Sequence, residues 1–412
     1  MNPSRQIRTA SLLFLAALVS AACSDTAGNG AEKTGDGGAG TSSTSGGTVL
    51  GGAPATGGRA AGGTAIVASG SPGSGGAAGT VGGNTTVSGG SGSGGSGDTA
   101  AGRCAPDVWS TLEECGFPGP DNTGPNPASC PGGTLIEMGS SSMPTIELDK
   151  DGALFECVNL RGRLRVTAKN VVIRNSRVTY DSGKKGGSAN ATAAIFLEDG
   201  ASARVERVEI DGLEGSHACI WHQGTSLAVR YVNCHGVDDG IFTWASSDTA
   251  GDEFTIEDSY FHDLTPLTAN GHMDGFQTEG AKNGVIRHNT YDMSAEGTSA
   301  IAIWNSLKSS SNLLIEGNLI AGGAAAIYAE DYDPSEQNPE GGNAVSAVRF
   351  VDNKFSTRVS PCVGKYFVWF ARPQLLYGGG PTDGWNRSGN VVLETNESVD
   401  DGNPHVNGRL CN

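Results

Sequence analysis

Six short apolar blocks recur along the middle of the chain, and each begins with a small residue followed by Ile or Phe. They are AIFL (194–197), CIWH (219–222), GIFT (240–243), GFQT (275–278), AIAI (300–303) and AIYA (326–329). The blocks are separated by roughly twenty to thirty-five residues, which is the period of a solenoid. This spacing predicts one short buried strand in each coil of a repeating fold.

A second series of blocks alternates apolar and polar residues on both sides of a polar corner, as strand segments do. Its members are VIRNSRV (172–178), RVERVEI (204–210), AVRYVNC (228–234), TIEDSYF (255–261), VIRHNTY (285–291), LIEGNLI (314–320) and RFVDNKF (349–355). Asn289, Asn318 and Asn353 occupy the same slot in three of these blocks. Because Asn tolerates the left-handed conformation and can stack in hydrogen-bonded ladders, we expect an Asn ladder at this corner.

Together the two series predict about three short strands per coil, stacked in parallel as a right-handed parallel β-helix. Helical folds fit poorly, because Gly, Asn, Asp, Ser and Thr interrupt every segment and no 3.6-residue stripe persists. A β-sandwich is the alternative for the same strands. Sandwich strands would not repeat a small residue followed by Ile in one phase.

The N-terminal segment has a composition different from the rest. Residues 1–22 contain Arg5 and Arg8 followed by the apolar run SLLFLAALVSAA, which is typical of a signal peptide. Cys23 follows two alanines, as at a bacterial lipoprotein cleavage site, although Ser20 stands where Leu is usual. We therefore expect Cys23 to be lipidated; a secreted protein cut near Ala22 is the alternative.

Residues 23–102 are rich in Gly, Ser, Thr and Ala, which cannot bury a core, and they predict a disordered linker. Residues 103–412 are long enough for one domain with a substantial core. We expect its N-terminal cap at about 103–155 and its other end near KYFVWF (365–370), since solenoids need covered ends. Such a chain would be exported, as an outer-membrane or cell-surface lipoprotein or as a secreted protein, and would be a monomer.

Eight of the nine cysteines remain once Cys23 is set aside, and an even number in an exported chain suggests disulfides. Proximity along the chain favours the pairs Cys104–Cys115, Cys130–Cys157, Cys219–Cys234 and Cys362–Cys411. No cysteine spacing matches a zinc site.

The formal net charge is −17, and no basic stripe is present to displace counterions from nucleic acid. Nucleic acid is therefore not expected as a partner, and the membrane is expected to be met only through the lipid anchor. An anionic polysaccharide would also be repelled unless a cation mediates the contact. The acidity could equally serve solubility alone.

Strand alternation assigns an inward and an outward side to the six apolar blocks. The first outward column holds Phe196, Trp221, Phe242, Gln277, Ala302 and Tyr328, and the second holds Glu198, Gln223, Trp244, Glu279, Trp304 and Glu330. Flat rings stack on sugars and carboxylates bind hydroxyl groups. The predicted substrate-binding residues are therefore Trp221, Phe242, Trp244, Gln277, Glu279, Trp304, Tyr328 and Glu330. Alternatively, loops such as the 243–275 insertion cover these rings as a second core.

Acidic residues precede two of the blocks, in VDDG (237–240) and HMDG (272–275). Asp239 and Asp274 occupy the same slot on neighbouring coils, where strands lie ~4.8 Å apart. Two carboxylates so close either bind a cation or raise one pKa to produce a general acid. Asp238 and His272 flank the pair, and Lys308 follows the next block. Simple Asp-Gly turns are the alternative explanation.

These coils and acids resemble the pectate-lyase-like superfamily of secreted β-helix proteins over about residues 155–395. The turns at 238–241 and 274–276 are similar to motifs of polygalacturonase-type hydrolases, whose aspartates protonate the glycosidic oxygen and activate water. That resemblance implies an acid–base set of Asp238, Asp239 and Asp274. The family's Gly-His-Gly and Arg-Ile-Lys blocks are absent, and TSAIAIWNS (298–306) follows instead. HMDGFQ followed by VIRHN also looks like a motif of uncharacterised secreted bacterial β-helix proteins.

Lyases of the superfamily imply a second arrangement, in which acids hold calcium and Arg or Lys removes the C5 proton of a uronate. Carried onto this chain, Asp239, Asp274 and Glu279 would hold calcium and Lys308 would be the base, although no family motif surrounds Lys308. We therefore expect a polysaccharide-binding protein that cleaves a uronate-containing glycan, as a lyase or a hydrolase. A non-catalytic glycan-binding or adhesive protein and a structural surface spacer are the alternatives.

Overall fold

The computed structural model describes Cys104 and residues 107–183, 193–244, 246–268, 271–305, 307–329, 345–365, 367–369, 386–400, 405–406 and 409–410. The signal peptide, Cys23 and the linker expected at 1–102 lie outside these ranges, as does Glu330. Within them, no helix is long and apolar enough to span a membrane.

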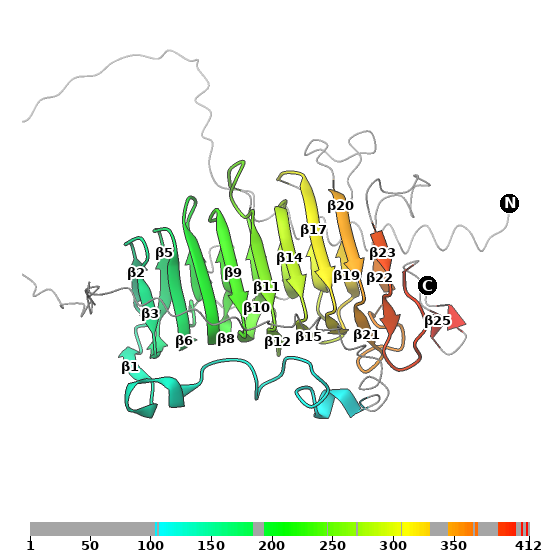
Figure 1. The fold of residues 1–412 in the computed structure, drawn as a ribbon, viewed down its shortest axis with the longest axis horizontal. Helices are drawn as coiled ribbons and strands as arrows, with labels where there is room; N and C mark the ends of the chain where they lie inside the picture. The colour runs from blue at the N-terminus through cyan, green and yellow to red at the C-terminus, as the bar shows by residue number, and fades with distance from the viewer. Residues whose placement is uncertain are drawn as a thin grey trace, which may run out of the picture. The chain divides into compact units, whose positions relative to one another are not determined.

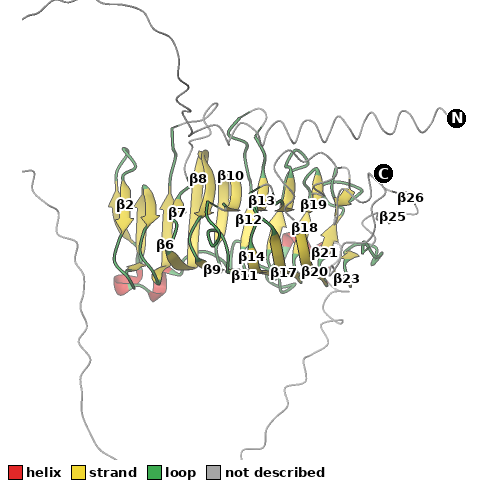
Figure 2. Ribbon diagram, turned by 90° about the horizontal axis from the view of Figure 1, so that it is seen from above, coloured by secondary structure: helices red, strands yellow, loops and turns green. Residues whose placement is uncertain are grey.

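The described strands form a parallel β-helix, which confirms the right-handed solenoid predicted from the repeating blocks (Figure 1). The strands lie in three parallel ladders, which we call A, B and C, and the coils between the first and the last contribute to each of them. Seen after a 90° turn, the strands of successive coils follow one another along a single axis (Figure 2). Polar corner residues separate most of the strands within a coil, and this is why most strands are short.

The long strands β6 (Val171–Thr179), β8 (Ser202–His222) and β10 (Asn233–Thr243) turn corners: β6 and β10 each contribute to two ladders, and β8 contributes to A, B and C. Ladder A contains parts of all three together with β1 (Ile136–Gly139), β4 (Val158–Arg161), β12 (Tyr260–His262), β15 (Thr290–Asp292), β18 (Leu319–Ala321), β21 (Lys354–Ser356) and β24 (Val391–Val392).

Ladder B contains parts of β8 and β10 together with β2 (Thr145–Leu148), β5 (Arg163–Val166), β7 (Ile195–Leu197), β13 (Asp274–Thr278), β16 (Ser299–Ile303), β19 (Ala325–Ala329) and β22 (Phe367–Trp369). Ladder C contains parts of β6 and β8 together with β3 (Leu154–Glu156), β9 (Ser226–Arg230), β11 (Phe254–Glu257), β14 (Lys282–Arg287), β17 (Ser310–Glu316), β20 (Val345–Val351) and β23 (Asn386–Ser388). A separate antiparallel pair joins β25 (His405–Val406) and β26 (Arg409–Leu410).

The core is the inside of the coil stack. In ladder B the aligned column of Ile and Phe points inward as predicted, and its members are fully buried: Ile195, Ile220, Ile241, Phe276, Ile301 and Ile327. Aromatic rings stack from one coil to the next, as where Phe261 of β12 lies 4.9 Å from Tyr291 of β15 in ladder A. Each side chain therefore packs against its equivalents in the coils before and after it.

The predicted Asn ladder is present at the corner between ladders C and A. The Oδ1 atoms of Asn318, Asn353 and Asn390 each accept the backbone N–H of the equivalent residue one coil earlier. The Nδ2 atom of Asn318 donates to Ile286 O at 3.0 Å and to Asn353 Oδ1 at 2.9 Å. The left-handed residue, however, is the one before the Asn.

Those left-handed residues are His288, Gly317, Asp352 and Gly389, with φ between 52° and 72°. The expectation that Asn itself adopts this conformation was therefore wrong by one position. The Asn side chains instead satisfy buried backbone groups that the tight corner leaves without strand partners.

Residues 107–133 form a strap that runs along this same corner, drawn in cyan in Figure 1. It contains three short 3-10 helices, η1 (Asp107–Ser110), η2 (Pro127–Ser129) and η3 (Pro131–Gly133). Trp109 Nε1 donates to Ser356 Oγ at 2.9 Å, near the C-terminal end of the stack. Gly124 N donates to Tyr231 O at 2.8 Å near its middle. The strap therefore crosses most of the coils before the chain enters β1.

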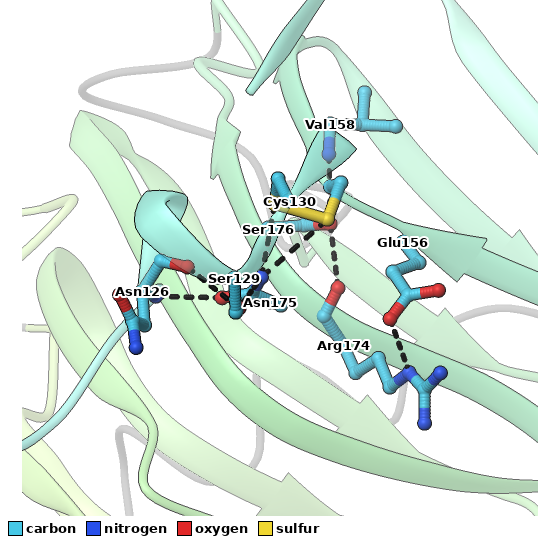
Figure 3. Close-up of a disulfide and its surroundings, with 9 residues drawn as sticks. Asn126, Ser129, Cys130, Glu156, Val158, Arg174, Asn175 and Ser176 are labelled. Carbon is cyan, nitrogen blue, oxygen red and sulfur yellow. Dashed lines mark hydrogen bonds and ion pairs between the residues drawn. A yellow bond between two sulfur atoms is a disulfide. The ribbon is translucent and has the colours of Figure 1, made fainter. Parts of the chain in front are cut away.

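At its far end the strap is fastened to the first coils by the Cys130–Cys157 disulfide (Figure 3). Beside that disulfide, Asn175 Oδ1 accepts the backbone N–H of Asn126 at 2.6 Å, and Asn175 Nδ2 donates to Ser129 Oγ at 2.8 Å. Whether this segment also caps the stack, as expected for 103–155, stays a prediction.

Three of the four predicted disulfides are confirmed: Cys104–Cys115, Cys130–Cys157 and Cys219–Cys234. Cys362 is also disulfide-bonded, and the pairing predicted for it involves Cys411, which lies outside the described ranges. Disulfides of this number indicate that the protein folds in an oxidising compartment.

Candidate functional site

The outward side of ladder B carries the described residues that the sequence analysis predicted to bind a substrate. The strand register places Phe196, Trp221, Phe242, Gln277, Ala302 and Tyr328 in one column, as predicted. Exposure changes along this column: Phe196 and Trp221 are half-buried, whereas Phe242, Gln277 and Tyr328 are buried. The face is therefore accessible over its N-terminal coils and covered over its C-terminal coils.

The two aspartates from neighbouring coils lie together at the start of these strands. Asp239 in β10 and Asp274 in β13 are both buried. Asp239 Oδ1 accepts the backbone N–H of Asp274 at 3.0 Å, and Asp274 Oδ1 accepts the hydroxyl of Ser299 from the next coil. Each carboxyl group thus has one oxygen fixed by the β-helix and the other directed away from that bond.

A histidine that the sequence analysis missed faces the first aspartate. His217 Nε2 lies 3.6 Å from Asp239 Oδ2, and its Nδ1 lies 3.7 Å from Asp238 Oδ2. The Asp238 carboxylate also accepts the backbone N–H of Leu267 at 3.3 Å. His217 occupies, one coil earlier, the slot that Asp238 fills in VDDG. Extending the block alignment by two residues upstream would have revealed it.

The second aspartate faces His272. His272 Nδ1 lies 3.8 Å from Asp274 Oδ2 and 3.5 Å from Gln277 Oε1. Gln277 Nε2 in turn donates to Glu279 Oε1 at 2.8 Å. Asp274 Oδ2 is buried and makes no hydrogen bond within the described structure. The structure thus brings together Asp238, Asp239, His272 and Asp274 as predicted and adds His217; we call these five residues the acid centre.

Burial sets the protonation of the acid centre. Burial raises the pKa of Asp274 to about 8, against the hydrogen bond from Ser299. Burial also raises the pKa of Asp239 well above its usual value, and the charges of Asp238 and Asp274 add to this effect. Burial lowers the pKa of His272 below its ordinary value. Near neutral pH the centre therefore combines protonated carboxyl groups with a neutral imidazole, which are an acid and a base side by side.

Aromatic residues extend from both ends of the acid centre. The His217 ring lies 5.2 Å from Trp221 and 5.6 Å from Phe242, and Trp221 lies 6.3 Å from Trp244. On the other side His272 lies 5.3 Å from Trp304, which lies 5.6 Å from Tyr328. Trp221 and Trp244 are half-buried, whereas Trp304 and Tyr328 are only 3% and 4% exposed. Only the first pair presents ring surface to a ligand.

Lys308 does not lie in the acid centre. Its Nζ atom forms an ion pair with Asp252 Oδ1 at 3.0 Å and donates to the backbone oxygens of Asp248 and Ala250 at 3.3 and 2.7 Å. These contacts fasten the 246–252 segment to ladder B. The geometry therefore gives Lys308 a structural role. It does not place Lys308 at the acid centre, where the predicted base would act.

The residues predicted to hold calcium are Asp239, Asp274 and Glu279. Asp239 Oδ1, Asp274 Oδ1 and Glu279 Oε1 each accept a hydrogen bond from the protein. No group of three His, Cys, Asp or Glu side chains in the described ranges could hold a metal ion. Calcium needs six or more oxygen ligands, so a calcium site at these three residues stays a prediction.

A cavity of about 750 Å³ lies elsewhere, where strands of ladder A end. His235, Asp263, Leu264, Asp292 and Arg358 are among its lining residues. Its charged groups are largely paired with one another: Arg358 Nη1 contacts Asp292 Oδ2 at 2.6 Å. The acid centre has buried carboxyl groups with raised pKa values, and Asp274 Oδ2 has no hydrogen-bond partner in the described structure. We therefore take the acid centre as the candidate site.

Comparison with known proteins leaves the geometry as the basis for assigning a function. No protein-family model matches the chain, and a search of curated proteins gives no match.

Proposed function

We propose that this chain is an exported β-helix protein that binds a uronate-containing polysaccharide and cleaves its glycosidic bond at the acid centre. The observation on which this proposal rests is the buried pair of Asp239 and Asp274. They lie one coil apart and are faced by His217 and His272. Neighbouring carboxyl groups with raised pKa values and a neutral imidazole supply the acid and the base that glycosidic cleavage requires.

Both possible reactions need the same two partners. In hydrolysis, a base takes a proton from water as its oxygen attacks C1, and an acid protonates the departing glycosidic oxygen. In elimination, a base takes the C5 proton, the C4–O bond breaks, and the same oxygen receives a proton. His272 and His217 are partly exposed and are the groups that can touch the sugar. Asp239 and Asp274 lie behind them and hold the exchangeable proton.

This proposal includes the resemblance to the pectate-lyase-like superfamily. The parallel β-helix and the paired acids in register support it. The acid set expected from the hydrolases, Asp238, Asp239 and Asp274, lies in one cluster here. His217 supplies an imidazole at this centre, where the chain lacks the family's Gly-His-Gly block.

A glycan-binding module without catalysis is the second candidate. The observation that favours it is the complete burial of Asp274 together with the coverage of Trp304 and Tyr328. In that function the half-buried rings of Trp221 and Trp244 would hold the glycan, and the buried acids would only stabilise the coil.

The export signals are also part of the proposal. Cleavage at a lipoprotein site would leave Cys23 lipidated, and the 24–102 linker would hold the domain off the membrane surface. The disulfides support an oxidising location. Cys23→Ser should then move the protein from the membrane fraction to the soluble fraction; unchanged fractionation would favour simple secretion.

The experiment that tests the function is a screen of uronate polymers with two product assays. Polygalacturonate, alginate and hyaluronan are incubated with the protein. New reducing ends with ultraviolet absorption from an unsaturated uronate identify a lyase, and reducing ends alone identify a hydrolase. Binding without products supports the binding module. Neither binding nor products from any polymer contradicts both candidates.

A further inference from the structure

Arg163 lies in β5 on the outward side of ladder B, on the accessible half of the face. Its guanidinium lies 5.7 Å from the centre of the Phe196 ring and 5.8 Å from that of Tyr180. Its Nε atom is buried and has no hydrogen-bond partner in the described structure. The positive charge of Arg163 therefore lies against two aromatic rings, and its Nε–H donor has no partner among the described residues.

The adjacent arginine shows the contrast. Arg165, two residues along the same strand, donates to Glu198 at 2.6 Å and forms an ion pair with Glu147 at 3.3 Å. The ion pairs found among the described residues do not include Arg163. A guanidinium is weakly hydrated and binds carboxylates through two parallel hydrogen bonds, so Arg163 is suited to a carboxylate from outside the protein.

A continuous aromatic surface connects Arg163 to the acid centre. Phe196 lies 5.8 Å from Trp221, and Trp221 lies 5.2 Å from His217. We call Phe196, Trp221 and Trp244 the aromatic shelf; all three are half-buried. Their rings offer stacking surface for sugars, and the shelf ends at the acid centre on one side and at Arg163 on the other.

The opposite half of the face cannot serve in this way. Trp304 and Tyr328, which continue the aromatic row beyond His272, are buried and pack edge to face. A sugar ring can stack only on an exposed ring face, so a bound glycan has to extend over the N-terminal coils, toward Arg163.

The spacing suits an oligosaccharide. Arg163 belongs to β5 and Asp239 to β10, and the register passes through β7 and β8 between them. Three such steps amount to ~14 Å at the usual separation of parallel strands. This distance corresponds to a few sugar units, so a carboxylate at Arg163 would belong to a unit away from the bond being cleaved.

From these contacts we infer that Arg163 binds the carboxylate of an acidic sugar at the end of the aromatic shelf and makes the site selective for uronates over neutral sugars. The inference rests on the proposed glycan-binding function. It also explains how a chain with a net charge of −17 can accept an anionic polymer: the approach is over coils where a guanidinium is presented, and burial raises the pKa of Asp239 at the end of this path.

The test compares acidic and carboxyl-reduced forms of the same oligosaccharides, prepared from polygalacturonate, alginate and hyaluronan, by calorimetry. Arg163→Gln should weaken binding of the acidic form about ten- to a hundredfold, because a charge-assisted hydrogen bond is lost, and leave the reduced form unchanged. Arg163→Lys should retain part of the preference. Arg174→Gln is the matched control, since it removes an equal charge from ladder C, where Arg174 pairs with Glu156 at 2.6 Å.

The outcomes separate this inference from the function beneath it. Equal loss of acidic and reduced ligands in Arg163→Gln, or an unchanged preference for the acidic form, overturns the role of Arg163 while glycan binding stands. Failure of the wild-type protein to bind either form of any of the three oligosaccharides overturns the proposed function, and this inference with it. Equal urea midpoints for the Arg163 and Arg174 variants confirm that folding is not the cause.

Discussion

The backbone N–H of Asp274 donates a 3.0 Å hydrogen bond to Oδ1 of Asp239, so one carboxyl group of the acid centre helps to hold the strand that carries the other. Asp239 therefore has a structural role in addition to the chemical role proposed for it. Asp274 contributes its backbone to this bond, so its carboxyl group can be changed with the bond intact. For this reason the experiments below change Asp274 and leave Asp239 in place.

The first prediction concerns stability against pH. The pKa of Asp274 is raised from an ordinary 3.8 to about 8 by burial, so the folded state keeps a proton that the unfolded chain releases. This contribution is fully present below about pH 4 and is lost as pH rises through about 8. The urea midpoint should therefore fall between pH 6.5 and 9, and less steeply in Asp274→Asn.

His235 also contributes in this range, because against burial the carboxylates of Glu209 and Asp211 raise its pKa, but it does so equally in the wild type and in Asp274→Asn. Two other histidines contribute only at lower pH. Burial lowers the pKa of His222 to about 4 and also lowers that of His272, so both destabilise the protein only as pH falls below about 6.5. A urea midpoint for Asp274→Asn that falls as steeply as that of the wild type between pH 6.5 and 9 would show that Asp274 is ionised in the folded protein.

The second prediction concerns His217. His217→Asn should lower the cleavage rate about a hundredfold or more, since an acid–base group that faces Asp238 and Asp239 is removed. His235→Asn is a matched control. That histidine also lies between two carboxylates, at 3.7 Å from Glu209 and 3.8 Å from Asp211, but belongs to ladder A. Equal rates in the two variants would remove His217 from the mechanism.

The third prediction concerns the Asn ladder. Asn318→Ala removes four buried hydrogen bonds, two donated by Nδ2 and two accepted by Oδ1. It should lower the free energy of unfolding by about 3 kcal/mol or more, because buried backbone groups lose their partners. Asn386→Ala, at an exposed position in β23, should change it by less than about 0.5 kcal/mol. Denaturant titration measures both; similar small losses would mean that the ladder is not a main source of stability.

The fourth prediction concerns the strap. Replacing both Cys130 and Cys157 by Ser opens a link across 27 residues and should cost about 3–4 kcal/mol. Amide exchange at Gly124 and Asn126 should accelerate, since the strap loses its covalent fastening. The matched variant without Cys219 and Cys234 should leave exchange in the strap unchanged. Unaltered exchange in the first variant would show that side-chain contacts alone hold the strap.

Local repetition explains what the sequence could predict. The block of a small residue followed by Ile recurs in one phase, so coil, inward column and outward column followed from it, as did the register of Asp239 with Asp274. Three disulfides joined cysteines near in sequence and were predicted on that ground. Each of these features depends on neighbours within one or two coils.

The features that the sequence did not predict depend on contacts between residues far apart along the chain. The strap contact of Trp109 with Ser356 joins residues 247 positions apart, and no local pattern encodes it. Strand alternation placed Trp304 and Tyr328 on the outward side but left open whether loops cover that side, and the structure buries both. Lys308 was assigned by its position after a block, whereas its partner Asp252 comes from two coils earlier in the chain.

The most direct test of the acid centre is glycan cleavage by Asp274→Asn beside Asp199→Asn, a change at an exposed aspartate in the turn after β7. On the uronate polymer that the wild-type protein cleaves, Asp199→Asn should retain the full rate. Asp274→Asn should release products about a hundredfold more slowly or worse, while still binding the oligosaccharide on the aromatic shelf. Cleavage by Asp274→Asn at the wild-type rate would contradict the assignment of this buried pair as the centre of the reaction.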